Sequence, residues 1–292
     1  MMPRKLLLIF LACWMSVASA RSLSPIFDDP APDPAHPPRM EVIHVPSGGV
    51  EFNGVVYVAG GPGPHPTFLF FHGIPGNEKN IDLLQAVRRA GWNAISVNYR
   101  GSWGSPGTYS LAGNLEDGKA ALAYIRDPAN ARKLDIDVNN IVIAGHSMGG
   151  WVTLHTLAAD DGVLGGLTIS AADFGPSGRD WQKDRAAIYA FMDDDKETLA
   201  GVTAEKLTDE MLSHKAQFAM QALAPKLVDR RLELLYSDDD FTEDSANLAK
   251  AIKAKGGKLV HARHVTTDHV WSDHRIALQK LVIAWLEGLQ KK

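Results

Sequence analysis

Cysteine is nearly absent from this sequence. The 292 residues contain one, Cys13, which lies in an apolar run near the N-terminus. If that run is removed on export, the mature chain has no thiol, so it can form no disulfide, no cysteine metal site and no thiol nucleophile. A chain of this length can bury a core large enough to fold without cross-links.

Concentrated positive charge is also lacking. Lys and Arg number 30 against 34 Asp and Glu, the formal net charge is −4, and no basic stripe stands out. Nucleic-acid binding needs a Lys/Arg face that neutralises phosphates, so the sequence argues against a nucleic-acid partner. No apolar run reaches the roughly 20 residues of a membrane-spanning helix, and no repeat of the solenoid kind is visible.

Residues 1–20 are typical of a signal peptide. Arg4 and Lys5 supply a short positive region, about ten apolar residues follow, and Ala-Ser-Ala at 18–20 has the small side chains that signal peptidase requires. We expect cleavage after Ala20, export to the periplasm or the medium, and no membrane anchor thereafter. Loss of Arg4 and Lys5 would change the formal net charge from −4 to −6. Lipidation at Cys13 is the rival, but the residues before it fit a lipoprotein signal poorly.

Residues 21–39 predict a proline-rich arm. Six prolines lie between Pro25 and Pro38. Because proline has no backbone N–H and restricts its own φ, we expect an extended surface segment that leads into the domain at 40–292.

Within 40–292, short apolar segments that predict strands alternate with segments of helical spacing. The predicted strands are 51–58, 67–71, 93–98, 141–144, 164–170, 232–236 and 259–262. The predicted helices are 81–89, 115–125, 151–159, 244–255 and 276–289. This alternation predicts an α/β fold with a mostly parallel central sheet and helices on both faces. Reactive groups of such sheets lie on loops at the carboxyl ends of the strands.

One stretch, 171–230, interrupts the alternation. It has no clear strand and carries polar, helix-like sequence, so we expect a helical insertion that forms a lid over the site. A plain surface elaboration is the alternative.

The sequence Gly145-His146-Ser147-Met148-Gly149 follows one predicted strand and precedes a predicted helix. A serine at the apex of such a sharp turn has a strained backbone and an exposed hydroxyl, which suits a nucleophile. Glycine two residues before and two after lets the backbone segments approach closely. The motif therefore predicts that Ser147 is the nucleophile.

Acyl transfer from a serine needs two backbone amides aimed at the developing oxyanion. Met148, directly after the nucleophile, predicts one of these donors. The second is expected from the loop at 72–76, where Ile74 is the best candidate because Pro75 has no amide hydrogen. We expect His72 to shape this loop by hydrogen bonding.

A carboxylate and then a histidine should follow the serine along the chain. Asp238, Asp239 and Asp240 follow the strand predicted at 232–236. Counting three residues beyond the small Ser237 selects Asp240 as the acid, with Asp239 second and Asp238 third. The base should lie in the loop after the last strand.

Four histidines cluster near the C-terminus: His261, His264, His269 and His274. His269 lies at the centre of the expected loop, so it is preferred to His274. A zinc-like site made from these histidines is the rival, but a strand and a loop do not provide regular ligand spacing. We therefore expect neither a metal nor a cofactor.

With these features in this order, residues 40–290 resemble the α/β-hydrolase superfamily. Segments 72–76, 98–107 and 114–118 look like those of bacterial single-domain hydrolases related to the prolyl-oligopeptidase catalytic domain and to dienelactone-hydrolase-like esterases. The resemblance implies an α/β-hydrolase fold and a triad of Ser147, Asp240 and His269. The absence of a β-propeller and of a Gly-Gly-Gly oxyanion loop argues against a large prolyl oligopeptidase and a long-chain lipase.

We therefore expect a serine hydrolase that cleaves a small-molecule carboxylic ester or a related acyl bond. Trp103, in the loop at 98–107, is a candidate for contact with the substrate, with loop packing as the alternative. The rival functions are a serine peptidase acting on short peptides and a binding protein without catalysis on the same scaffold. The sequence does not name the acyl group, the leaving group or the oligomeric state.

Overall fold

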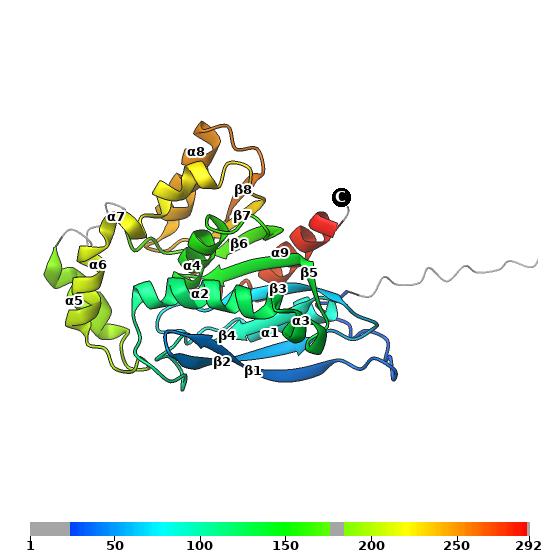
Figure 1. The fold of residues 1–292 in the computed structure, drawn as a ribbon. Coiled ribbons are helices and arrows are strands. Elements are labelled where there is room, and N and C mark those ends of the chain that lie inside the picture. Colours follow the sequence, from blue (N-terminus) through cyan, green and yellow to red (C-terminus); the bar gives the residue numbers. More distant parts are fainter. Residues whose placement is uncertain (1–23, 176–183, 291–292) are drawn as a thin grey trace, which may run out of the picture.

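The structure is a computed structural model that describes residues 24–175 and 184–290. Figure 1 shows its ribbon, with strands packed side by side and helices around them. The signal peptide predicted at 1–20, together with Cys13, lies outside the described residues, as does part of the predicted arm and of the predicted lid. No helix among the described residues is long and apolar enough to cross a bilayer.

The centre of the molecule is an eight-stranded sheet with the order β1-β2-β4-β3-β5-β6-β7-β8. Its strands are β1 (Arg39–Ser47), β2 (Val50–Val58), β3 (His65–Phe71), β4 (Asn93–Val97), β5 (Ile136–His146), β6 (Gly165–Ile169), β7 (Leu232–Tyr236) and β8 (Val260–His264). All neighbouring pairs from β4 to β8 are parallel, whereas β1 and β2 pair antiparallel. The mostly parallel α/β sheet predicted from the sequence is thereby confirmed.

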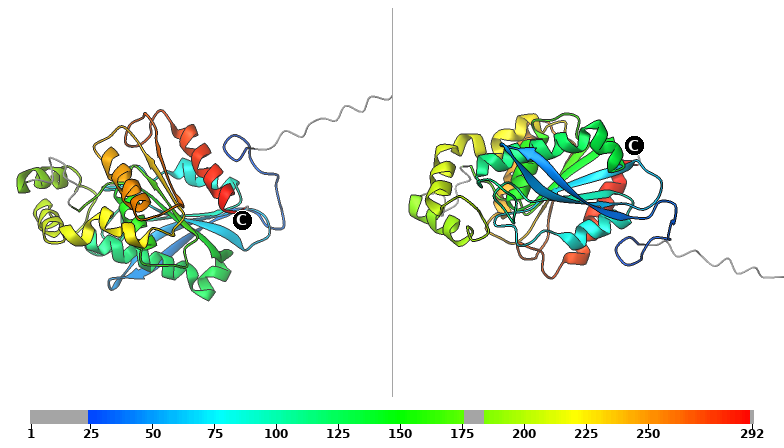
Figure 2. Two further views of the ribbon diagram at one scale, coloured as in Figure 1. Left: turned by 90° about the horizontal axis from the view of Figure 1, so that it is seen from above. Right: turned by 60° about the horizontal axis from the view of Figure 1, so that its bottom comes forward.

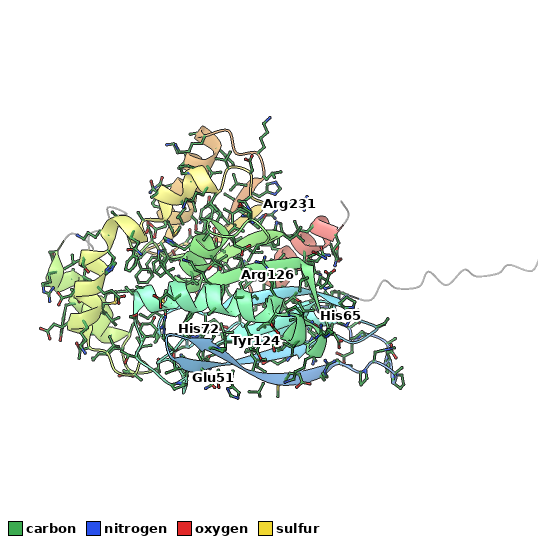
Figure 3. The ribbon with its side chains drawn as sticks, in the orientation of Figure 1. Glu51, His65, His72, Tyr124, Arg126 and Arg231 are labelled. Atoms are coloured by element: carbon green, nitrogen blue, oxygen red, sulfur yellow. The ribbon has the colours of Figure 1, made fainter. Side chains whose placement is uncertain are left out.

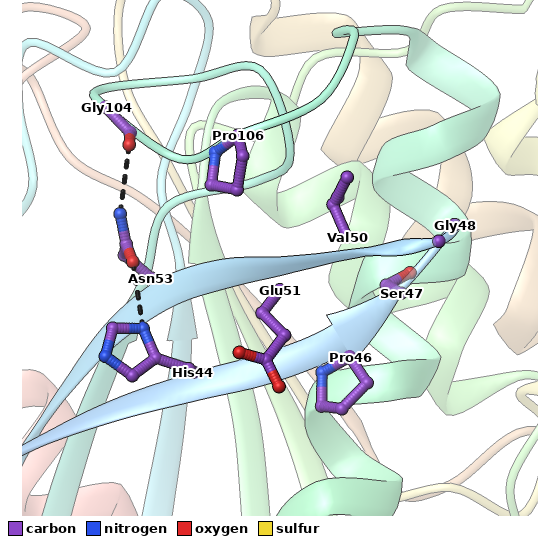
Figure 4. Close-up of a pocket in the computed structure, with 10 residues that line it drawn as sticks. His44, Pro46, Ser47, Gly48, Val50, Glu51, Asn53, Gly104 and Pro106 are labelled. Carbon is purple, nitrogen blue, oxygen red and sulfur yellow. Dashed lines mark hydrogen bonds between the residues drawn. The ribbon is translucent and has the colours of Figure 1, made fainter.

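Strand β1 was not predicted, although it pairs with β2 along its whole length. Only two residues of this strand, Ile43 and Val45 in its second half, are buried, so its alternating apolar pattern is weak. Gly48 and Gly49 make the turn to β2 with φ of 57° and 82°, a region that favours glycine. A shallow groove lies between this hairpin and residues 104–106 (Figure 4), where Asn53 donates to the Gly104 carbonyl at 3.1 Å.

Helices cover both faces of the sheet, as Figure 2 shows. One face packs against α1 (Ile81–Arg89) and α9 (Arg275–Gln290), whose apolar side chains join Phe68 and Phe70 in one core cluster. The opposite cluster receives side chains from α2 (Leu111–Arg126), α3 (Pro128–Lys133), α4 (Met148–Leu157) and α8 (Thr242–Ala254), and also from the helices of the insertion. Because both faces are covered, central strands such as β4 and β6 are buried at every residue.

The insertion predicted at 171–230 is helical where the structure describes it. It contains α5 (Arg185–Asp194), α6 (Ala204–Ser213), α7 (Lys215–Phe218) and the 3₁₀ helix η2 (Met220–Lys226). Helices α5 and α6 lie beside the N-terminal end of α2 (Figure 1), where Glu210 accepts hydrogen bonds from the amides of Leu111 and Ala112 at 2.9 and 2.8 Å. This carboxylate satisfies two free amides of α2, so it fastens α6 to the main domain.

The imidazole of His155 on α4 is mostly buried, and its burial makes the stability of the protein depend on pH. Its ring packs edge-on against Trp151, its Nε2–H donates to the Phe218 carbonyl at 3.3 Å, and burial lowers its pKa from 6.5 to about 4. The folded protein therefore resists a proton that the unfolded chain takes up below pH 6.5. The free energy of unfolding is therefore unaffected by protonation of this residue above pH 6.5, and it decreases as the pH falls from 6.5 toward 4.

We predict that His155→Gln reduces the acid sensitivity of the protein, because glutamine can still donate to Phe218 but does not titrate. Between about pH 7.5 and pH 5, the wild type should lose up to about 2 kcal/mol more unfolding free energy than the variant. Urea unfolding of both proteins at the two pH values measures this difference. Parallel losses in the two proteins would contradict the assignment.

Candidate active site

Ser147 occupies the turn between β5 and α4, with φ 55° and ψ −122°. This is a strained conformation for a residue with a side chain. The surrounding structure holds it in place, because its amide donates to the Ile169 carbonyl at 2.9 Å and its carbonyl accepts from the Ala172 amide at 3.2 Å. Ser147 therefore sits in the strand–turn–helix context that the sequence predicts.

The two glycines flanking the turn are required by close backbone contacts. A Cβ at Gly145 would lie 2.1 Å from the Gly149 carbonyl oxygen, and one at Gly149 would lie 2.0 Å from the Phe71 carbonyl oxygen. Neither obstacle is a flexible side chain, so no side chain can be accommodated at either position. The start of α4 consequently lies directly on the end of β3.

The loop after β3 reaches Ser147. At Gly73, a Cβ would lie 3.0 Å from the Ser147 Cβ and 3.5 Å from its Oγ, so the backbone of this loop contacts the serine side chain. His72 shapes the loop: its Nδ1–H donates to the Gly73 carbonyl at 2.7 Å, and burial lowers its pKa to about 4, which keeps the ring neutral. Figure 3 labels His72 and His65 at opposite ends of β3, with His72 on the lid side.

The predicted oxyanion donors, Ile74 and Met148, belong to these two contacting segments. The side chain of Met148 is fixed in the core, since its sulfur accepts from the Tyr109 hydroxyl at 3.0 Å and from Asn114 Nδ2 at 3.2 Å. Within residues 24–175 and 184–290, the amides of Ile74 and Met148 donate to no protein acceptor. Two unused donors thus flank Ser147.

Trp103 lies beside the same loop. Its indole N–H donates to the Pro75 carbonyl at 2.6 Å, and the Lys79 ammonium lies 4.4 Å from the centre of its ring. Thr198, from the insertion, donates its hydroxyl to the same Pro75 carbonyl at 3.3 Å. The polar group of Trp103 is therefore occupied in positioning the loop that carries Ile74. Contact of its ring with a substrate stays a prediction.

The structure brings His269 together with Asp239. The ring Nδ1–H donates to Oδ2 of Asp239 at 2.7 Å, and the Asp239 side chain is 7% exposed. The prediction that Asp240 is the partner of His269 is wrong, because Asp240 is exposed to solvent. Asp238 is also exposed and pairs with His264 at 2.6 Å. Of the four clustered histidines, His269 is the one that contacts this buried carboxylate.

Hydrogen bonds within the loop explain the choice of Asp239. Its Oδ1 accepts from the Phe241 amide at 2.8 Å, a tight turn that points Asp239 inward and leaves the next residue outside. Burial alone would raise the pKa of Asp239, but hydrogen bonds from His269, Ser237 and Phe241 bring the pKa below its usual value. The sequence prediction placed the acid three residues after Ser237, whereas the carboxylate that contacts His269 lies two residues after it.

His146 is a functional contact that the sequence did not predict. Its Nε2–H donates to the His269 carbonyl at 2.9 Å, and the two rings are 4.7 Å apart. Burial lowers the pKa of His146 to about 3, so this ring is neutral and only one nitrogen carries a hydrogen. The residue before the nucleophile thus holds the loop that carries His269.

One nitrogen of the His269 ring remains available for proton transfer. Among the described residues, Nε2 of His269 has no hydrogen-bond partner, and its side chain is 30% exposed. No group of three His, Cys, Asp or Glu side chains in the described part of the chain could hold a metal ion. The arrangement can therefore accept a proton at His269 and hydrogen-bond an anion beside Ser147.

Comparison with known proteins identifies the fold and the family. The chain aligns with an *Arabidopsis thaliana* relative, alpha/beta hydrolase domain-containing protein WAV2, at 33% identity over 89 residues, which are 30% of this chain and 27% of that protein. Its fold is similar to that of a *Pyrobaculum calidifontis* esterase, with a TM-score of 0.64 and 16% identity over 88% of each chain.

A second similar fold is that of a *Pyrococcus horikoshii* acylaminoacyl peptidase, with a TM-score of 0.63 and 20% identity over 86% of this chain and 41% of that chain. At these identities, the two structures support the fold alone. The model of the alpha/beta hydrolase family matches residues 55–286, which is most of the domain. The chain belongs to the alpha/beta hydrolase family.

Proposed function

We propose that this protein is an exported serine hydrolase that cleaves a carboxylic ester or a related acyl bond. Membership of the alpha/beta hydrolase family supports hydrolysis. The observation that carries the finer proposal is the conformation and position of Ser147: it is a strained serine at a strand–helix turn, so close to Gly73 that a Cβ added there would lie 3.0 Å from the Ser147 Cβ.

The first half of the reaction forms an acyl-enzyme. Ser147 Oγ attacks the carbonyl carbon of the substrate while Nε2 of His269 takes the hydroxyl proton. Asp239 stabilises the imidazolium and keeps Nδ1 as the protonated nitrogen of the neutral ring. The negative charge that forms on the carbonyl oxygen is bound by the amides of Ile74 and Met148. Loss of the alcohol completes this half: His269 donates its proton to the leaving alcohol, and the carbonyl re-forms as the carbon–oxygen bond to the alcohol breaks.

The second half regenerates the enzyme. Water attacks the carbonyl carbon of the acyl-enzyme with His269 as base, the bond between Ser147 Oγ and the acyl carbon breaks, His269 returns its proton to Oγ, and the acid product leaves. The start of α4 points at the reacting centre, and its partial positive charge favours the anionic intermediate.

Substitution of the nucleophile tests the chemistry. Ser147→Ala should lower turnover of a short p-nitrophenyl ester by at least about a thousandfold, because no other group forms the acyl-enzyme. A fluorophosphonate probe should label the wild type at Ser147 and leave the variant unlabelled. Ser213→Ala, which removes an exposed hydroxyl from α6, is the control and should label normally. Near-normal activity of Ser147→Ala would refute the proposal, and faster turnover of aminoacyl-nitroanilides than of esters would favour a peptidase.

Neighbouring aspartates provide a matched pair for the acid. Asp239→Asn should reduce kcat by about a thousandfold, because an amide cannot stabilise the imidazolium and can hold the ring in the wrong tautomer. Asp240→Asn removes the same charge one residue away and should retain kcat within about twofold. Steady-state kinetics on one ester compares the two. If Asp240→Asn were the inactive variant, the acid would be Asp240.

Export rests on the residues at 1–20. When the full-length chain is expressed in a bacterium, the protein recovered outside the cytoplasm should begin at Arg21, because Ala20 ends the signal-peptidase motif. Intact-mass measurement and N-terminal sequencing determine the start. Recovery of an uncleaved chain in the cytoplasm would argue against export.

A further inference from the structure

A line of buried hydrogen bonds runs from Asp239 into the core. Ser237 Oγ donates to Oδ2 of Asp239 at 2.8 Å, the same oxygen that accepts from His269. Ser237 Oγ and Ser170 Oγ are 2.6 Å apart, and Trp271 Nε1 donates to Ser170 Oγ at 3.1 Å. Ser170, Ser237 and Trp271 are each no more than 1% exposed, so water does not compete for these bonds.

The hydrogen bonds in this line can be donated in only one direction. Asp239 is ionised, since the pKa of its carboxyl lies below the usual value, and a carboxylate only accepts. The single hydroxyl hydrogen of Ser237 is therefore committed to Asp239. Ser170 must then donate to Ser237, and its own oxygen accepts the indole hydrogen of Trp271. Every donor in the line is directed toward the carboxylate.

Two residues of this line, Ser170 and Trp271, have strained backbone conformations. Ser170 has φ 46° and Trp271 has φ 60°, in the left-handed region where glycine is favoured. A glycine would relieve that strain at either position but would remove the hydroxyl or the indole from the line. Strain retained next to a reactive group is a reason to look for a functional role.

We propose that Ser237, Ser170 and Trp271 are positioning residues that fix the orientation and hydrogen bonding of the Asp239 carboxylate opposite His269, and thereby tune the low-pH limit of activity, at which His269 takes up a proton. The proposal rests on the proposed function of Ser147, Asp239 and His269. Among the described residues, none of the three positioning residues forms a hydrogen bond with Ser147 or with the His269 ring. They act through the charge and orientation of one carboxylate.

Other titratable groups also face this pair. His146 from β5 lies beneath His269, and the exposed Asp238–His264 pair lies on the neighbouring β7 loop and β8. Asp195, at the end of α5, acts electrostatically on His269, and burial raises the pKa of Asp195 to about 6. Arg275 at the start of α9 acts on His146. Asp195 titrates in the range of interest, so the test must be repeated in an Asp195→Asn background.

The decisive measurement is the pH profile of kcat/KM for single variants. Ser237→Ala should move the acid limb to higher pH by about half a unit, because an Asp239 oxygen with one hydrogen bond fewer binds the protonated His269 ring more strongly, so the base takes up its proton at higher pH. Ser170→Ala should produce a smaller shift in the same direction, and Trp271→Phe a smaller one again, since each lies one bond further away. The same order should appear in the Asp195→Asn background.

Thr242→Val is the matched control for the loop. The Thr242 Oγ1 lies 2.6 and 2.7 Å from the backbone carbonyl oxygens of Ser237 and Asp239, which share its single hydrogen, and it forms no hydrogen bond with the carboxylate. Its loss should lower the melting temperature without moving the acid limb. An equal limb shift in Thr242→Val, or no shift in folded Ser237→Ala, would overturn the proposal.

The two levels of inference can fail separately. If the wild type is not labelled by a fluorophosphonate at Ser147, the proposed function fails. If the wild type is labelled and the pH dependence of labelling is unchanged in Ser237→Ala, only the positioning role fails. Circular dichroism verifies the fold of each variant, and if Ser237→Ala does not fold, the shifts in Ser170→Ala and Trp271→Phe decide the outcome.

Discussion

The arrangement of this site depends on one contact between backbones, at which the first turn of α4 lies on the last residue of β3. Strands β3 and β5 are neighbours in the sheet, and the start of the helix that follows β5 lies against the end of β3. It can do so only where Gly149 presents no side chain to the Phe71 carbonyl. That approach places Ser147 against the loop of Gly73 and Ile74, so the nucleophile and the predicted oxyanion donors are brought together by main-chain packing.

Much of this could be predicted from the sequence. The strand before Ser147 and the helix after it are marked by apolar patterning over many residues, and strand β7 has the bounds that its apolar run predicts. Such patterns reflect burial, which the fold imposes on whole segments. The edge strand β1 was missed because only one side of half its length is buried, and two buried residues make a weak pattern.

The acid was less predictable for a physical reason. Asp238, Asp239 and Asp240 have the same chemistry, and which of them points inward depends on local hydrogen bonds such as the one between Asp239 and the Phe241 amide. No periodicity encodes a turn of that size. His146 was missed for a similar reason: its position in the motif shows that it precedes the nucleophile, but its partner lies 123 residues away in the chain.

The insertion is joined to the catalytic loops through polar contacts. Glu210 binds the start of α2, and Thr198 shares the Pro75 carbonyl with Trp103. The amide of Ala200 also donates to the Gly101 carbonyl at 2.7 Å. The insertion and the loop that carries Ile74 therefore have common supports, so the position of the insertion and the position of the predicted oxyanion donor are not independent.

The bond from His146 to the main chain of His269 separates two requirements that an active site usually combines. The ring of a general base must be able to turn toward the nucleophile and then toward the leaving group, whereas its loop must stay where it is. Here the loop is anchored through the carbonyl of His269, which leaves the imidazole of that residue out of the anchor. Substitution of His269, the proposed base, leaves this backbone carbonyl in place, so the loops should keep their spacing. An inactive variant should therefore retain the shape that recognises the substrate.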